Sequence, residues 1–361
     1  MKLKKIRVLV VEDSPVVRML LTHMLKADPD VEILAAVNDG PAALQFLDKH
    51  TPDVVLMDIH MPGIDGFETT RRIMETKPLP IVICSATMDP RDVNTTFRSM
   101  EAGAVAFVEK PAAVVSLDFD ESARKLVETV KLMAEVKVVR RWARNKNGTA
   151  AAAAILAMPT GPHPAARNVS LVVVGVSTGG PPVLRTVLTG LPQDFPAPIL
   201  IVQHITAGFL RGMAEWLAQT THLPVRIAEQ DGIPLPGHVY LAPDNLHMGV
   251  EAGGRIALSR DPPENGLRPS VGHLFRSAAR VYGPQAVGIL LTGMGRDGAE
   301  ELKRMRDLGA LTIVQDEPSS VVYGMPGAAI ELDAATYVLP PEGIRAALQT
   351  WVKRTRPGRA P

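Results

Sequence analysis

The run LMDIHMPGIDG, residues 56–66, decides the fold of the first part of this chain. The apolar segment 53–57 reads as a buried strand, and it brings the carboxylate of Asp58 to its C-terminal end. A tight turn follows, because Pro62 fixes φ and Gly63 tolerates a positive φ. A carboxylate held at a strand end suits an aspartate that accepts a phosphoryl group. The simpler alternative is that Asp58 only caps a turn.

Three further apolar segments end in a polar side chain in the same way. Residues 6–11 run into the acidic pair Glu12-Asp13 and then an amphipathic helix, residues 81–84 end at Ser85, and residues 104–109 end at Lys110. In an open parallel sheet the carboxyl ends of the strands share one edge, where ligands bind. Clustered carboxylates there favour Mg²⁺. Lys110 would neutralise a transferred phosphoryl group, and Ser85 could donate a hydrogen bond to it.

Residues 5–111 resemble a response-regulator receiver domain, which implies a flavodoxin-like parallel sheet. The resemblance implies phosphorylation of Asp58 by a histidine kinase, with Mg²⁺ held by Glu12, Asp13 and Asp58. It also implies that Ser85 is the hydroxyl switch residue and Phe107 the aromatic switch residue. The positions that match the family are Glu12, Asp13, Asp58, Ser85, Phe107 and Lys110.

Length and composition indicate a soluble protein of more than one domain. The chain has 361 residues, 46% of them hydrophobic, and a net charge of +1, which argues against a broad nucleic-acid-binding surface. Its one cysteine, Cys84, lies in a strand that reads as buried, which fits a reducing compartment. We find neither a signal peptide nor an uncharged apolar run of about 18 residues, so we expect a cytoplasmic protein without membrane insertion.

A change in composition marks the boundary between two domains. Basic residues surround Trp142, and a run of alanines (150–154) and a Pro- and Gly-rich stretch (159–164) follow. Such a segment is typical of a flexible linker. We therefore predict a receiver domain over residues 1–136, a linker over 137–168 and a second α/β domain over 169–356.

The second domain opens with a strand, 171–176, that runs into Ser177 in a glycine-rich turn. The pattern Gly175-x-Ser177-x-Gly179 has the mechanics of a nucleophile elbow, in which small residues let a carbonyl approach the hydroxyl. Free N–H groups at the following helix start could hold an oxyanion. A turn that binds phosphate is the alternative for this motif alone.

Two more apolar segments of this domain end in residues that could complete a catalytic triad. Residues 198–202 precede Gln203-His204, and residues 286–291 precede a glycine-rich loop that contains Asp297. The chain order Ser, His, Asp differs from the α/β-hydrolase order, so we do not expect that fold. The remaining histidines, which are His222, His238, His247 and His273 among others, show no metal-ligand spacing, so we expect no zinc site.

Residues 169–350 resemble the catalytic domain of the chemotaxis protein-glutamate methylesterase (CheB) family. The matching stretches are GVSTGG at Ser177, QH at His204, TGMGRDG at Asp297, YLAP at 240–243 and RPSV at 268–271. The chain departs from the family at Gly272-His273, where an acidic residue is expected. The resemblance implies a Rossmann-like fold with Ser177, His204 and Asp297 as triad and no cofactor in the esterase site. Backbone N–H groups of Thr178 and Met294 are the candidates for the oxyanion hole.

The combined resemblance implies a phosphorylation-regulated esterase that acts on glutamate methyl esters of methyl-accepting chemotaxis receptors and deamidates their glutamines. The phosphodonor would be a chemotaxis histidine kinase, and we expect that the unphosphorylated receiver blocks the Ser177 edge. Two alternatives stay open: a receiver-controlled adaptor that binds receptors without turnover, and the same esterase in a sensory system other than flagellar chemotaxis. A DNA-binding regulator is disfavoured, because residues 169–350 lack a helix-turn-helix with a basic recognition helix.

Overall fold

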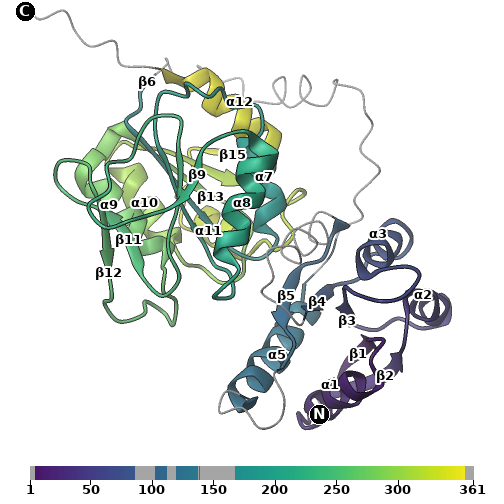
Figure 1. Cartoon of the computed structure of the whole chain (residues 1–361). Helices are drawn as coiled ribbons and strands as arrows, with labels where there is room; N and C mark the ends of the chain where they lie inside the picture. Colours follow the sequence, from purple (N-terminus) through teal and green to yellow (C-terminus); the bar gives the residue numbers. More distant parts are fainter. Residues whose placement is uncertain (1–4, 86–101, 112–118, 137, 139–166, 354–361) are drawn as a thin grey trace, which may run out of the picture. The chain divides into compact units, whose positions relative to one another are not determined.

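The computed structural model describes residues 5–85, 102–111, 119–136, 138 and 167–353 (Figure 1). The chain divides into two compact units, unit 1 over Met1–Asn145 and unit 2 over Lys146–Pro361. The predicted linker lies outside the described residues except at 138 and at its end. There the prediction is wrong, because Arg167–Asn168 form strand β6, which pairs in parallel with β16 (Val352–Lys353) and so belongs to unit 2.

Unit 1 is a five-stranded parallel sheet with the strand order β2-β1-β3-β4-β5, which confirms the predicted flavodoxin-like fold. Its described elements in chain order are β1 (Ile6–Val11), α1 (Pro15–Lys26), β2 (Val31–Val37), α2 (Gly40–Lys49), β3 (Val54–Asp58), α3 (Gly66–Thr76), β4 (Ile81–Ser85), β5 (Ala106–Glu109) and α5 (Phe119–Ala134).

The strand order of unit 1 places its acidic residues together. Strand β1 pairs with β2 on one side and with β3 on the other, so the chain turns in opposite directions after β1 and after β3. A crevice forms at such a switch point, outside the carboxyl ends of the strands. Every residue of β3 is buried, because both faces of the sheet are covered. The acidic pair after β1 and Asp58 at the end of β3 therefore meet at the switch point.

Unit 2 is built on a seven-stranded parallel sheet with the order β15-β14-β13-β7-β8-β10-β9. Besides β6 and β16 its elements are β7 (Leu171–Val176), α7 (Gly180–Leu188), β8 (Ile199–Gln203), α8 (Leu210–Thr221), β9 (Val225–Ile227), β10 (Val239–Leu241), the antiparallel pair β11 (His247–Val250) and β12 (Ile256–Ser259), α9 (Val271–Tyr282), a 3₁₀ turn (Gly283–Gln285), β13 (Ala286–Leu290), α10 (Ala299–Asp307), β14 (Leu311–Gln315), α11 (Gly324–Glu331), β15 (Tyr337–Leu339) and α12 (Pro341–Trp351).

Helices cover both faces of the unit 2 sheet (Figure 1). Leu171 and Val173 of β7 join a buried cluster with α9, α10 and α11, so the alternate residues of this strand face the side of α7, α8 and α12. Strand β7 lies between β13 and β8, which makes its carboxyl end the switch point. Ser177, His204 and Asp297 follow β7, β8 and β13, and all three are thereby brought to one edge.

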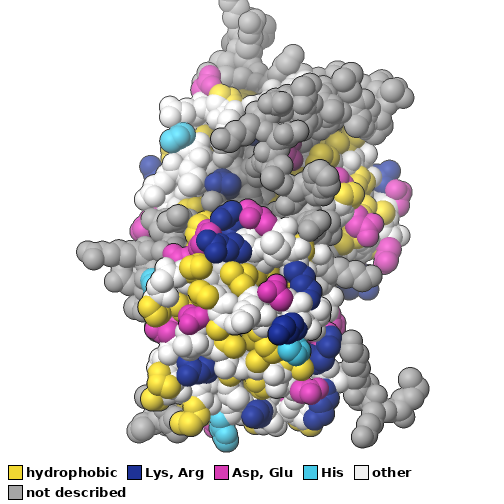
Figure 2. All heavy atoms as spheres, turned by 90° about the vertical axis from the view of Figure 1, so that its right-hand side faces the viewer, with side chains coloured by type: hydrophobic (Ala, Val, Ile, Leu, Met, Phe, Trp, Pro, Cys, Tyr) yellow, Lys and Arg dark blue, Asp and Glu magenta, His cyan; other side chains and the backbone are white. Residues whose placement is uncertain are grey.

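One face of the molecule carries side chains of both charges (Figure 2). Basic and acidic side chains are interspersed with hydrophobic ones on the face shown in Figure 2. In the part of the chain that the structure describes, no helix is both long and apolar enough to cross a membrane.

Candidate active site and phosphorylation site

The edge of the unit 1 sheet holds a buried cluster of two carboxylates and one ammonium group. The Nζ atom of Lys110 lies 2.8 Å from Oε2 of Glu12 and 2.9 Å from Oδ1 of Asp58. Both carboxylates are almost completely buried. Burial raises the pKa of Glu12, and the charge of Asp58 adds to this while Lys110 opposes it. Burial alone would lower the pKa of Lys110, but its hydrogen bonds to Glu12 and Asp58 raise it overall.

The donor set of this edge fits Mg²⁺. Oxygen atoms of Glu12, Asp13 and Asp58 lie within 4.8 Å of one another. Buried carboxylates that repel each other gain from a divalent cation, and Mg²⁺ prefers such oxygens with water or phosphate completing its shell. Ser85 is buried, and its hydroxyl has no hydrogen-bond partner among the described residues, so it can donate to a new acceptor at Asp58. Phe107 of β5 is buried.

The turn after β7 holds Ser177 by its backbone. The Ser177 N–H donates to the carbonyl of Thr292 at 3.0 Å, and the Ser177 carbonyl accepts from Gly180 at 2.9 Å. The side-chain amide of Gln203 donates to the carbonyls of Ser177, at 2.8 Å, and His204, at 2.9 Å. Gln203 is buried, so one amide group ties the serine turn to the histidine. The sequence pattern did not predict this role for Gln203, which was noted only because it precedes His204.

The structure brings His204 and Asp297 together. The Nε2 atom of His204 lies 3.0 Å from Oδ2 of Asp297, at an angle outside hydrogen-bond geometry. Within the described residues, no hydrogen bond joins the Ser177 hydroxyl to His204. Such contacts are often long in an enzyme without substrate and shorten in the complex. The predicted triad is therefore assembled at one edge, and its catalytic role stays a prediction.

Asp297 also lies on the N-terminus of helix α9, which sequence reasoning missed. Its Oδ2 accepts the N–H of Val271 at 2.7 Å, and its Oδ1 accepts the N–H of Gly272 at 3.1 Å and the hydroxyl of Ser270 at 2.9 Å. Burial would raise the pKa of Asp297, but the His204 ring and these two backbone donors lower it overall. The helix start thus keeps Asp297 ionised and holds it beside His204.

The change Asp297→Asn should destabilise unit 2 in a pH-dependent way. We expect a loss of about 1.5–3 kcal/mol near pH 6, because a charged acceptor is replaced by a neutral one. The folded pKa of Asp297 lies below its ordinary value of 3.8, so its stabilisation is complete above that value and is lost as the pH falls through the folded pKa. Urea unfolding followed through the buried Trp216 and Trp351 should show the stabilities of the two proteins converging as the pH falls below 3.8. A constant or growing difference would contradict this role of the carboxylate.

Both predicted oxyanion donors have unoccupied N–H groups. Within the described residues, no backbone carbonyl accepts from the N–H of Thr178 or of Met294. A Cβ atom on Gly293 would lie 2.7 Å from the Ser177 Cβ, so the loop that carries Met294 runs directly beside the serine. The N–H groups of Thr178 and Met294 therefore stay our candidates for the oxyanion hole.

Gly175 matters because β7 passes close to the start of α9. A Cβ atom at Gly175 would lie 2.2 Å from Cγ1 of Val271, whose N–H holds Asp297. We expect Gly175→Ala to cost about 1–3 kcal/mol in unfolding free energy, measured by urea unfolding, because the added methyl group displaces the start of α9. Adding Val271→Ala removes the clashing methyl groups and should restore part of the lost unfolding free energy. A double variant no better than Gly175→Ala would show that this contact is not the cause.

One cluster in unit 2 was not predicted from histidine spacing. Ligand atoms of His247, Glu264 and His273 lie within 4.8 Å of one another, so these residues form a group that could hold a metal ion. Sequence spacing missed it because His247 is in β11 and His273 in α9, which pack together only in the fold. The two imidazole rings are stacked, with centroids 4.8 Å apart.

Comparisons with known proteins agree with this architecture. The model of the CheB methylesterase family matches residues 172–348, and that of the response regulator receiver domain matches residues 8–118. A protein-glutamate methylesterase/protein-glutamine glutaminase of Nitrosospira multiformis is 54% identical over 347 residues, which are 96% of this chain and 97% of that protein. One of Syntrophus aciditrophicus is 51% identical over 95% of this chain and 97% of its own length. The solved catalytic domain of Thermotoga maritima CheB methylesterase is 38% identical, with a TM-score of 0.49, over 51% of this chain and 98% of that domain.

One unit of the chain has a receiver fold, and the other carries a serine, a histidine and an aspartate at one edge of its sheet. Together these features define a response regulator whose output domain is a hydrolase. The match covers nearly the whole length of this chain and of these relatives, which makes the assignment specific. The chain belongs to the CheB family of protein-glutamate methylesterases/protein-glutamine glutaminases.

Proposed function

We propose that the chain hydrolyses glutamate methyl esters, and deamidates glutamines, on methyl-accepting chemotaxis receptors by using Ser177, His204 and Asp297. The observation that carries the proposal is the placement of the three residues after neighbouring strands at the switch point of the unit 2 sheet, with His204 and Asp297 3.0 Å apart. The family and the names of the relatives supply the substrate class.

The chemistry follows from which ring nitrogen is free. Asp297 faces Nε2 of His204, which leaves Nδ1 to take the hydroxyl proton of Ser177. The serine oxygen bonds to the side-chain ester carbonyl carbon, and the N–H groups of Thr178 and Met294 stabilise the resulting oxyanion. Methoxide leaves with the proton from His204 as methanol. Water then attacks the acyl-serine and gives its proton to His204, which returns a proton to the departing serine oxygen, so that the glutamate side chain and the free serine are released.

The same steps deamidate a glutamine. The leaving group is then ammonia, which takes its proton from His204 in place of methoxide, and the acyl-serine intermediate is identical. No residue outside the triad and the two backbone donors is needed to change from one substrate to the other.

The receiver site supplies the control. Glu12, Asp13 and Asp58 would hold Mg²⁺, which would supply positive charge against the phosphoryl oxygens. Lys110 would move its ion pair to the new phosphoryl oxygens, and the unpartnered hydroxyl of Ser85 would donate to them. We propose a chemotaxis histidine kinase as phosphodonor and the cytoplasm as the location, and we propose that the unphosphorylated receiver restricts access to Ser177.

A methanol-release assay on methylated receptor membranes tests this function. The chain should release methanol from methylated receptors, release ammonia from receptors that carry glutamine, and do both faster with a phosphodonor. A chain that binds receptors without releasing methanol would be an adaptor instead. Parallel assays on receptors from different sensory systems would separate flagellar chemotaxis from its alternative.

A further inference from the structure

The hydroxyl of Ser270 lies between two carboxylates. Its Oγ atom is 2.9 Å from Oδ1 of Asp297 and 3.2 Å from Oε2 of Glu264, and the residue has no exposed surface. A hydroxyl carries one hydrogen, so it can donate to only one of the two carboxylates at a time. The choice decides whether Asp297 receives its side-chain donor.

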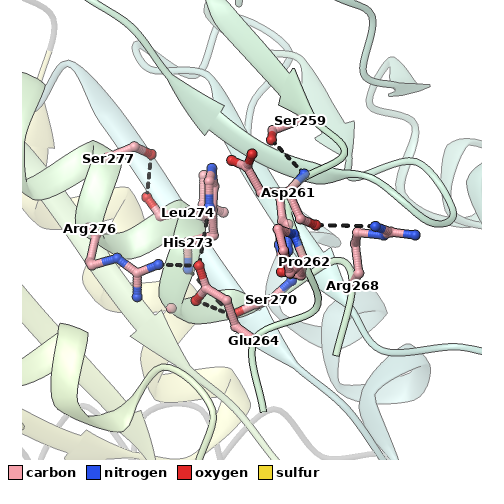
Figure 3. A network of polar contacts seen from close by, with 12 residues as sticks. Ser259, Asp261, Pro262, Glu264, Arg268, Ser270, His273, Leu274, Arg276 and Ser277 are labelled. Carbon is pink, nitrogen blue, oxygen red and sulfur yellow. Dashed lines mark hydrogen bonds and ion pairs between the residues drawn. The ribbon is translucent and has the colours of Figure 1, made fainter. Parts of the chain in front are cut away.

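Glu264 is already engaged by the guanidinium of Arg276 and by the imidazole ring of His273. Arg276 forms a close ion pair with Oε1 of Glu264, and Nδ1 of His273 lies 3.4 Å from the same oxygen (Figure 3). Burial would raise the pKa of Glu264, but Arg276 and then His273 lower it overall. Arg276 neutralises this carboxylate through Oε1, and the Ser270 hydroxyl lies closer to Asp297 than to Oε2 of Glu264, so the hydroxyl donates to Asp297.

The surroundings of Gly272 explain how the chain tolerates the missing acidic side chain there. A Cβ atom at Gly272 would lie 2.9 Å from Oε2 of Glu301, so this carboxylate fills the space beside the glycine. Arg276 donates to Oε1 of Glu301 at 2.8 Å. The guanidinium of Arg276 thus bridges Glu264 and Glu301. These two carboxylates lie near the start of α9, although neither residue belongs to that helix.

The hydrogen bonds of His247 favour this role of the cluster over a metal site. Its Nδ1 accepts the N–H of Ser270 at 3.2 Å, and its Nε2 lies 3.2 Å from the carbonyl of Pro262. Both nitrogens therefore have partners, and a metal ion would have to displace one of them and approach a carboxylate that Arg276 already holds. Through Nδ1, His247 instead fixes the backbone of Ser270.

We propose that Ser270 is a positioning residue for Asp297, and that the Glu264–Arg276 ion pair keeps the Ser270 hydroxyl directed at Asp297. The proposal rests on the proposed function of the triad. It predicts that the Ser270 hydroxyl acts on turnover through the orientation of Asp297 and His204, and leaves substrate binding unchanged.

The first test compares Ser270→Ala, Ser270→Gly and Ser270→Thr in the whole chain by methanol release. Both Ala and Gly remove the donor, so kcat should fall about 10- to 100-fold in each, with KM within about twofold. Ser270 is also the N-cap of α9, and glycine is a much better N-cap than alanine. If Ser270 had a purely structural role, Ser270→Gly would therefore keep more of kcat than Ser270→Ala.

Ser270→Thr keeps the hydroxyl and should retain most of kcat. Equal kcat in wild type and Ser270→Gly, or an unchanged kcat with a raised KM, would overturn the proposal.

The second test concerns the outer ion pair. Arg276→Met leaves Glu264 without its cation and free to compete for the hydroxyl, so kcat should fall about 3- to 10-fold. Adding Glu264→Gln removes the competing charge and should restore most of kcat. A double variant as slow as Arg276→Met overturns the role of the pair. Ser177→Ala should be assayed beside these variants to separate failure of the triad from failure of the Ser270 proposal. An active Ser177→Ala protein refutes the triad. An inactive Ser177→Ala protein together with a fully active Ser270→Gly protein refutes only the role of Ser270.

Discussion

Ser177→Ala should lower methanol release by a factor of at least about 10⁴, because it removes the atom that bonds to the ester carbonyl. The substituted side chain is partly exposed at the end of β7, so folding and thermal stability should stay close to those of the wild type. The measurement is the initial rate of methanol release from methylated receptor membranes, with receptor binding measured in parallel.

Ser170→Ala is the matched control for this change. It makes the same substitution at the amino end of the same strand, where the Ser170 hydroxyl donates to Oε1 of Gln285 at 3.0 Å. Its rate should stay within about twofold of the wild type, as for a surface substitution far from the site. A Ser177→Ala protein that matches this control would remove Ser177 from the mechanism.

Deletion of residues 1–145 should raise methanol release in the absence of a phosphodonor by about 5- to 150-fold, the range of a typical coupling between sites. The reason is that unit 2 carries its own complete sheet and all three triad residues, while the proposed restriction comes from unit 1. The truncated chain should no longer respond to a phosphodonor, because Asp58 is absent.

Asp58→Asn in the whole chain is the control for the deletion. It removes the phospho-acceptor and keeps the receiver, so its rate should stay at the level of the unphosphorylated wild type with or without phosphodonor. A truncated chain no faster than Asp58→Asn would mean that the receiver does not inhibit unit 2.

Strand ends were the most predictable feature of this sequence. Buried parallel strands read as continuous apolar runs, and the predicted runs 6–11 and 171–176 coincide with β1 and β7. The polar residue that follows each run then had to lie on one sheet edge. This is why Asp58, Ser177 and His204 could be located without a structure.

Contacts made across elements could not be read in the same way. Ser270 and Glu264 lie 27 and 33 positions before Asp297, and no periodicity links them to it. Their meeting depends on α9 directing its N-terminus at the end of β13, which is a tertiary arrangement. The His247–Glu264–His273 cluster was missed for the same reason, since β11 and α9 pack together only after folding. The end of the linker was missed because β6 has only two residues.

The most direct test of a phosphorylation-controlled serine esterase is the initial rate of methanol release by the whole chain with and without a phosphodonor and Mg²⁺. Wild type, Asp58→Asn and Ser177→Ala should be measured side by side on methylated receptor membranes. We predict that phosphodonor accelerates the wild type, leaves Asp58→Asn at its basal rate, and elicits no methanol from Ser177→Ala. Phosphodonor-stimulated methanol release by Ser177→Ala would contradict the account.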